Sequence, residues 1–282
     1  MLVTSRHQAA LTARFLKPVA PMLEDLFLAL RAETDLALGP DAPPVYGKPY
    51  PYGYCLEITK DVQARLNARL RQPRHPAERA IKAYLNSGGA ARRVWGVLRD
   101  RFFQNAFQIG GLYIDVSNDT VDVSKPKVEI LPMDQSGLEP VRDAAHFARI
   151  AERYWGVTFF ANHALPSLAP LFPMIGVDAR GKARLYSDIR YMVNLFRSSQ
   201  FVQAECWLED GPAPSMALIR AIRARCPADL LAANPVATQE AALQACRSAR
   251  AEGRASDDDW LEARARDLLA IGRSPIPVLE RG

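Results

Sequence analysis

The sequence lacks the features of several common protein classes. No stretch of its 282 residues reaches the roughly 18 consecutive apolar residues of a membrane span. Its four cysteines form no Cys-x-x-Cys pair, and there are only four histidines, so neither a zinc site nor a disulfide framework is expected. A glycine-rich phosphate loop, a Gly-x-Ser-x-Gly motif and a His-x-Asp pattern are also missing. We therefore expect no metal, no cofactor and no membrane span. Cytoplasmic location is the default, with export as an effector left open.

Composition is that of a globular protein, with 49% hydrophobic and 24% charged residues and a formal net charge of +5. The basic residues are concentrated between positions 65 and 101, a stretch that contains ten arginines and lysines and only two acidic residues, Glu78 and Asp100. This excess favours an anionic partner, with Arg92 and Arg93 as candidate contacts. The alternative is a solvated helix face. The pattern predicts nothing about the oligomeric state.

Hydrophobic spacing predicts helices in the first 90 residues, strands in the middle and helices again at the end. The strands are expected at about 93–99, 102–109, 112–117 and 127–133, with Gly110 and Gly111 as a hairpin turn. Another hairpin is expected around "DARGK", and Ser187 or Asp188 is expected to cap the helix that follows. This order indicates an α+β fold: a central antiparallel sheet packed against N-terminal helices, with a helical C-terminal subdomain. We expect the α+β domain at 1–210 and the helical subdomain at 211–282.

The stretch "YGKPYPYGYCLEIT" leads from a loop into an expected helix that begins near Cys55. Apolar residues follow Cys55 at intervals of three and four residues. This spacing places Cys55 on the apolar stripe of the helix, which is expected to face inward. Tyr50, Tyr52 and Tyr54 belong to an ordered aromatic loop and are candidate binding residues.

A cysteine at the start of a helix, followed by a strand hairpin that carries an aspartate, resembles the core of the transglutaminase-like and papain-like cysteine enzymes. The matching segments are "GYCLEIT" and "NAFQIGGLYIDVSND". The resemblance implies that Cys55 is the nucleophile and that Asp115 orients the partner of the thiol. Asn105 stands where the family has its histidine. Three alternatives follow: another residue such as His163 acts as base, the fold is related and inactive, or the resemblance is accidental and Cys55 is a buried residue of the apolar helix stripe.

Two functions follow as hypotheses. The first is a cysteine-dependent acyl-transfer or amide-hydrolysing enzyme that acts on a peptide or a small-molecule amide. The second is a non-catalytic binding protein that presents the tyrosine-rich loop and the arginine-rich face to an anionic partner. The acidic run around Asp115, Asp119 and Asp122 is interpreted as a polar turn that closes a strand, rather than as a cation site.

Overall fold

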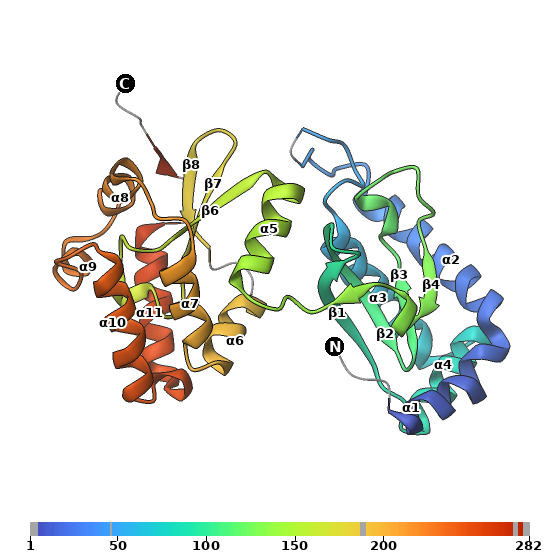
Figure 1. Cartoon of the computed structure of the whole chain (residues 1–282). Helices are drawn as coiled ribbons and strands as arrows, with labels where there is room; N and C mark the ends of the chain where they lie inside the picture. Colours follow the sequence, from blue (N-terminus) through green and yellow to red (C-terminus); the bar gives the residue numbers. More distant parts are fainter. Residues whose placement is uncertain (1–4, 46, 187–189, 273–275, 279–282) are drawn as a thin grey trace. The chain divides into compact units, whose positions relative to one another are not determined.

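The computed structural model describes residues 5–45, 47–186, 190–272 and 276–278. The chain forms two compact units, Met1–Pro140 and Val141–Gly282, each of which has its own antiparallel sheet (Figure 1). The α+β class predicted from the sequence is therefore confirmed. The prediction of a single central sheet is wrong, because the strands are divided between two separate sheets. The expected boundary at 210/211 lies inside the second unit, because the helices beyond it pack with the strands and helices that follow Pro140.

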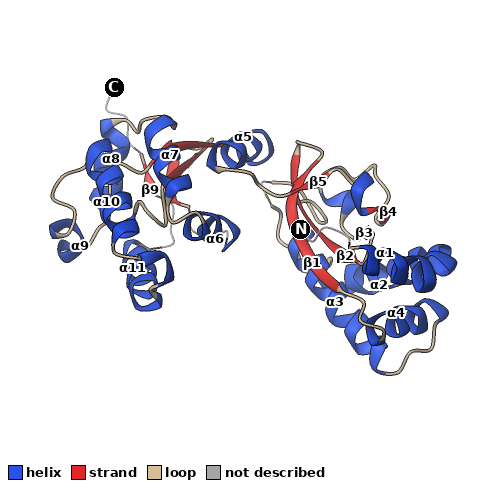
Figure 2. Ribbon diagram, turned by 60° about the horizontal axis from the view of Figure 1, so that its bottom comes forward, coloured by secondary structure: helices blue, strands red, loops and turns tan. Residues whose placement is uncertain are grey.

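Among its described residues the first unit combines the α-helices α1 to α4 with a five-stranded sheet in the order β4-β3-β2-β1-β5 (Figure 2). Its elements are α1 Arg6–Leu11, α2 Ala20–Leu38, α3 Cys55–Arg71, α4 Pro76–Asn86, β1 Ala91–Leu98, β2 Phe102–Ile109, β3 Leu112–Asp115, β4 Glu129–Pro132 and β5 Leu138–Glu139. The four strands expected here are all present within a few residues. Between α1 and α2 the chain makes a π-helical turn over Thr12–Leu16 and a 3-10 turn over Lys17–Val19. Pro18 has no N–H to donate within a continuous α-helix, whereas Pro21 lies in the first turn of α2, where that N–H is not needed.

The helices cover one face of this sheet. Phe107 and Ile109 from β2 and Ile114 from β3 join the buried leucines of α2 and the Ile58 side of α3 in the main core. The opposite face carries a smaller cluster that includes Ala106 and Tyr113. Successive strand residues therefore point to opposite faces, as the period of two requires.

The predicted hairpin turn at Gly110 and Gly111 is confirmed. Ile109 pairs with Leu112 across it, and Gly110 has a φ of 59°, which glycine adopts without steric cost. A β-carbon at Gly110 would collide with the Thr12 hydroxyl, while that hydroxyl accepts a hydrogen bond from the Gly111 N–H at 2.9 Å. The turn is thereby fixed to the first helical segment.

The described residues of the second unit form a four-stranded sheet, in the order β6-β7-β8-β9, and the α-helices α5 to α11. Its elements are α5 Ala144–Trp155, β6 Val157–Ala161, β7 Met174–Asp178, β8 Lys182–Leu185, α6 Arg190–Ser198, α7 Val202–Asp210, α8 Met216–Arg223, α9 Ala228–Ala232, α10 Gln239–Ala251, α11 Asp258–Ile271 and β9 Ile276–Pro277. The "DARGK" turn joins β7 to β8, with Gly181 at a φ of 70°. The expected helix caps Ser187 and Asp188 lie outside the described residues. No helix in the described part of the chain is long and apolar enough to cross a membrane.

Candidate functional site

Cys55 is the first residue of α3, where the tyrosine-rich loop passes into the helix. Its thiol lies against β2, and the Asn105 side-chain amide donates a hydrogen bond to the sulfur at 3.4 Å. Thr59, one turn further along α3, donates its hydroxyl proton to the Cys55 carbonyl at 2.6 Å. The structure thus brings together the two residues that the resemblance placed side by side.

Burial raises the pKa of the Cys55 thiol to about 11. The hydrogen bonds from Asn105 act in the opposite direction, but the negative charges of Asp115 and Glu57 add to the effect of burial. At pH 7 about one thiol in ten thousand is then ionised. Because the thiolate is the nucleophile, Cys55 is held in its unreactive form.

Asp115 does not orient Asn105. Asp115 lies on β3 with its carboxylate on the face of the sheet opposite α3, where it accepts bonds from Gln104 Nε2 at 2.8 Å and Tyr113 Oη at 2.9 Å. Its other oxygen accepts from the Ser117 N–H at 2.8 Å. The expected chain of cysteine, amide and aspartate is therefore not formed, since alternation along β2 and β3 sends Asn105 and Asp115 to different faces.

The carboxyl group of Asp115 is completely enclosed, and burial raises its pKa to about 6 even though four hydrogen bonds favour the charged form. Gln104, Tyr113 and Ser117, which surround it, were not singled out from the sequence. The alternation of Tyr113, Asp115 and Ser117 at two-residue steps is the signal that could have placed them on one face.

His163 belongs to the second unit and is buried there at 6% exposure. Its Nε2 lies 3.1 Å from the carbonyl oxygen of Leu208 on α7, so the imidazole is engaged within its own unit. In the first unit His75 caps α4 through its ring, while His7 is exposed on α1. Neither His7 nor His75 is bonded to Cys55.

The tyrosine-rich loop, residues 47–54, is tied to the unit by its own side chains. Tyr50 donates to Asp35 at 2.6 Å, and Tyr54 donates to the Pro43 carbonyl at 2.7 Å. The Lys48 ammonium lies 4.3 Å from the centre of the Tyr52 ring. The loop is therefore ordered, as predicted, but the hydroxyls of Tyr50 and Tyr54 are already satisfied.

A surface hollow of about 370 Å³ lies beside this loop, lined by Arg31, Asp35, Tyr50 and Lys127 among others. Its charges neutralise one another. Arg31 pairs with Asp35 and Asp119, and Lys127 pairs with Asp35 at 2.6 Å. The pairing of Asp119 with a buried arginine also agrees with the structural interpretation of the acidic run.

Several arginines of the basic stretch between positions 65 and 101 form ion pairs with carboxylates of the first unit. Arg65 binds Asp61 and Glu33, Arg69 binds Glu33 and Glu78, and Arg99 binds Glu129. At the start of β1, Arg92 donates to Gln108 at 3.1 Å and Arg93 is exposed.

One group of cations stays without carboxylate partners among the described residues. Arg71, Arg74, Arg79 and Lys82 surround the turn from α3 to α4. Arg79 donates to the Arg74 carbonyl at 2.6 Å, and Lys82 donates to the Arg71 carbonyl at 3.2 Å. We call these four residues the basic turn.

Comparison of the chain with models of protein families, with curated proteins and with solved structures gives no match.

Proposed function

We propose that the first unit is a non-catalytic binding module, built on a core that resembles the cysteine enzymes, and that it takes an acidic peptide at the basic turn. The observation that carries the proposal is the contact between Asn105 and Cys55. The group beside the sulfur is an amide, which cannot accept the thiol proton. The raised pKa of Cys55 supports the same conclusion.

The basic turn supports the binding part of the proposal. Arg71, Arg74 and Arg79 are exposed, and two hydrogen bonds hold the charged groups of Arg79 and Lys82 against the backbone of the turn. The nearest carboxylate in the sequence, Glu78, is 3% exposed and accepts from Arg69 and from the backbone of Arg74 and His75. An acidic peptide is favoured over a nucleic acid because no exposed aromatic side chain alternates with these cations for base stacking.

The catalytic question is tested by iodoacetamide labelling of Cys55 between pH 6 and pH 10, read by mass spectrometry. The wild-type thiol should react more slowly than a model thiol throughout this range. Asn105→His supplies a base at the contact position and should raise the labelling rate at pH 7 by about tenfold or more. If the wild-type Cys55 is labelled faster than the model thiol below pH 7, Cys55 is an activated nucleophile and the proposal of a non-catalytic module fails.

The binding surface is tested by fluorescence anisotropy with a labelled poly-glutamate peptide. Combined replacement of Arg71, Arg74 and Arg79 by glutamine should weaken binding about tenfold, at roughly 0.5 kcal/mol for each exposed charge. The matched control removes three exposed cations elsewhere in the unit, Lys17→Gln, Lys60→Gln and Arg101→Gln. Equal weakening by both triple variants would show that only net charge matters and would refute a defined surface.

A further inference from the structure

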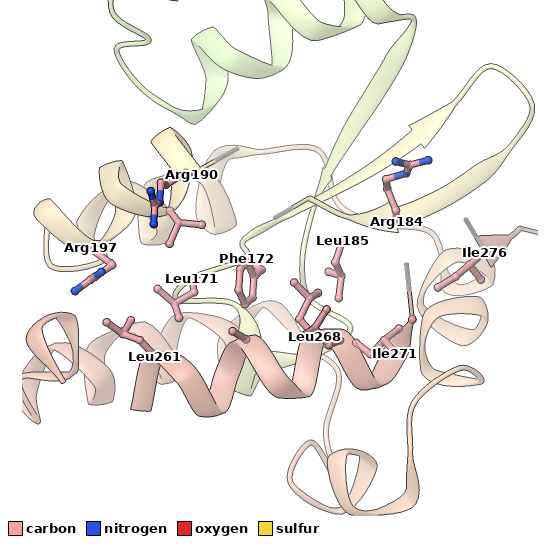
Figure 3. A pocket seen from close by; sticks show the side chains of 14 residues that line it. Leu171, Phe172, Arg184, Leu185, Arg190, Arg197, Leu261, Leu268, Ile271 and Ile276 are labelled. Atoms are coloured by element: carbon pink, nitrogen blue, oxygen red, sulfur yellow. The ribbon is translucent and has the colours of Figure 1, made fainter. Parts of the chain in front are cut away.

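The second unit contains a pocket of about 650 Å³ that the proposed function does not use (Figure 3). Its walls come from α6, α11, β8, β9 and the segment around Leu171 and Phe172. The volume lies within the range of about 300 to 1,000 Å³ that is typical of small-molecule sites. Because five separate segments line it, the pocket has the form of a site for a compact ligand.

The floor of the pocket is apolar and incompletely covered. Leu261 and Leu268 of α11 point toward Leu171 and Phe172 in Figure 3, yet both leucines are only half-buried. Leu269 on the same helix is 53% exposed, and among the fourteen residues of α11 only Ile271 is buried. A helix of this length normally derives its stability from burial of its apolar face. An apolar occupant would supply that burial.

The rim of the pocket on α6 is cationic. Arg190 and Arg197 lie on this helix and line the pocket, and no acidic side chain does so among the described residues. Arg197 is held by the Ala255 carbonyl at 3.1 Å and by the largely exposed Asp258 at 3.5 Å. Arg190 is exposed and has no carboxylate partner in the described part of the chain. Arg184 lines the pocket from β8, at a distance from α6 (Figure 3).

We propose that this pocket binds a single-chain aliphatic carboxylate, a fatty acid, with its chain along α11 and its carboxylate at Arg190. The two parts of such a ligand match the two parts of the pocket. The alkyl chain removes the leucines of α11 from water, at about 25 cal/mol for each Å² covered. The carboxylate meets a planar guanidinium that can bind both of its oxygens.

The test is calorimetric titration of the full chain with three probes that separate chain from head group. Dodecanoate should bind at one site per chain, 1-dodecanol about tenfold more weakly because it lacks the charge, and acetate not measurably because it lacks the chain. Arg190→Gln should reduce the affinity for dodecanoate about tenfold and leave the affinity for dodecanol unchanged. Arg184→Gln removes the same charge from the other side of the pocket and should change neither affinity by more than about twofold.

A second variant tests whether the ligand lies on the apolar floor of the pocket, which α11 forms. Ala265→Trp places an indole from the exposed side of α11 into the pocket and should abolish binding of both dodecanoate and dodecanol, at an unchanged melting temperature. The proposal is overturned if dodecanoate does not saturate, if dodecanol binds as tightly as dodecanoate, or if Arg184→Gln weakens binding more than Arg190→Gln. Binding of an acidic amphipathic helical peptide in place of dodecanoate would also overturn it and would identify the pocket as a protein-docking groove.

Discussion

The guanidinium of Arg31 binds the carboxylate of Asp119 through two parallel hydrogen bonds, Nη1 to Oδ1 at 2.6 Å and Nη2 to Oδ2 at 2.9 Å. Arg31 has no exposed surface; its Nε donates to Asp35, and its Nη1 donates to the Val116 carbonyl as well as to Asp119. A helix of the first unit and the segment after β3 are thus joined by a buried charge pair.

Replacement of one partner of this pair should destabilise the protein strongly. Asp119→Asn leaves a buried guanidinium without its bidentate carboxylate, which typically costs about 3–5 kcal/mol of the free energy of unfolding. Urea denaturation followed by circular dichroism measures the loss. Asp122→Asn, in the same segment but exposed, is the control and should leave the urea midpoint nearly unchanged. A loss at Asp119 no greater than at Asp122 would show that the pair contributes nothing.

Asp115 should make stability depend on pH. Its pKa is about 6 in the folded protein against an ordinary value of 3.8, so protonation favours the folded state. This contribution is complete below pH 3.8 and is lost as the pH rises through 6, for a total of about 3 kcal/mol. Thermal melts of wild type and Asp115→Asn from pH 3.5 to pH 7.5 should diverge accordingly. Parallel pH profiles for the two proteins would contradict the prediction, whatever their absolute difference.

The other cysteines should react with N-ethylmaleimide in the order of their exposure. Cys206 on α7 is exposed, whereas Cys246 on α10 is buried and burial raises its pKa to about 12. At pH 7.5 we therefore expect Cys206 to be modified first and Cys246 only after denaturation. Peptide mapping over time gives the order. Early modification of Cys246 in the folded protein would be inconsistent with its position in the core.

Phe27 should be a principal core residue of the first unit. It is fully buried on α2, and its ring centre lies 6.1 Å from that of Phe107 on β2. Phe27→Ala should cost about 3–5 kcal/mol of the free energy of unfolding through lost burial and the remaining cavity. Leu36, on the same helix but 80% exposed, provides the control. Leu36→Ala should change stability by less than about 0.5 kcal/mol, and a similar loss for both would contradict the assignment.

Each unit should fold without the other. Since each has its own sheet and its own buried residues, fragments 1–140 and 141–282 should each show a cooperative melt and dispersed amide resonances. A fragment that lacks both properties would show that its core depends on the rest of the chain.

Local structure was readable from the sequence because it depends on near neighbours. The spacing of Ile58, Val62 and Leu66 predicted α3, and Gly110 with Gly111 predicted the tight hairpin, as the structure shows. The prediction of a single sheet was wrong, because the two-residue alternation of a strand does not show which hairpins join the same sheet. In the structure the β1 to β5 strands form one sheet and the β6 to β9 strands form another.

The candidate site was only partly predictable. The apolar stripe of the helix predicted that Cys55 faces inward, and the hairpin predicted that Asn105 lies beside it; the structure has both. The position of Asp115 could also have been worked out. Counting outward from the pair Ile109 and Leu112 puts Val116 opposite Asn105, so Asp115 belongs to the other face. The partners of the arginines could not be predicted, since Glu33 and Glu129 are distant in sequence from the residues that they neutralise.

The two partners of the Arg31–Asp119 pair become available at different times during synthesis on the ribosome. Asp119 is added 88 residues after Arg31, which corresponds to roughly 4 to 18 s at ordinary rates of translation. Until then Asp35, one turn further along α2, is the partner that the arginine can have, and the carboxylate that binds it through two hydrogen bonds is still missing. The full set of contacts that buries Arg31 is therefore complete only after the segment that follows β3 has been made.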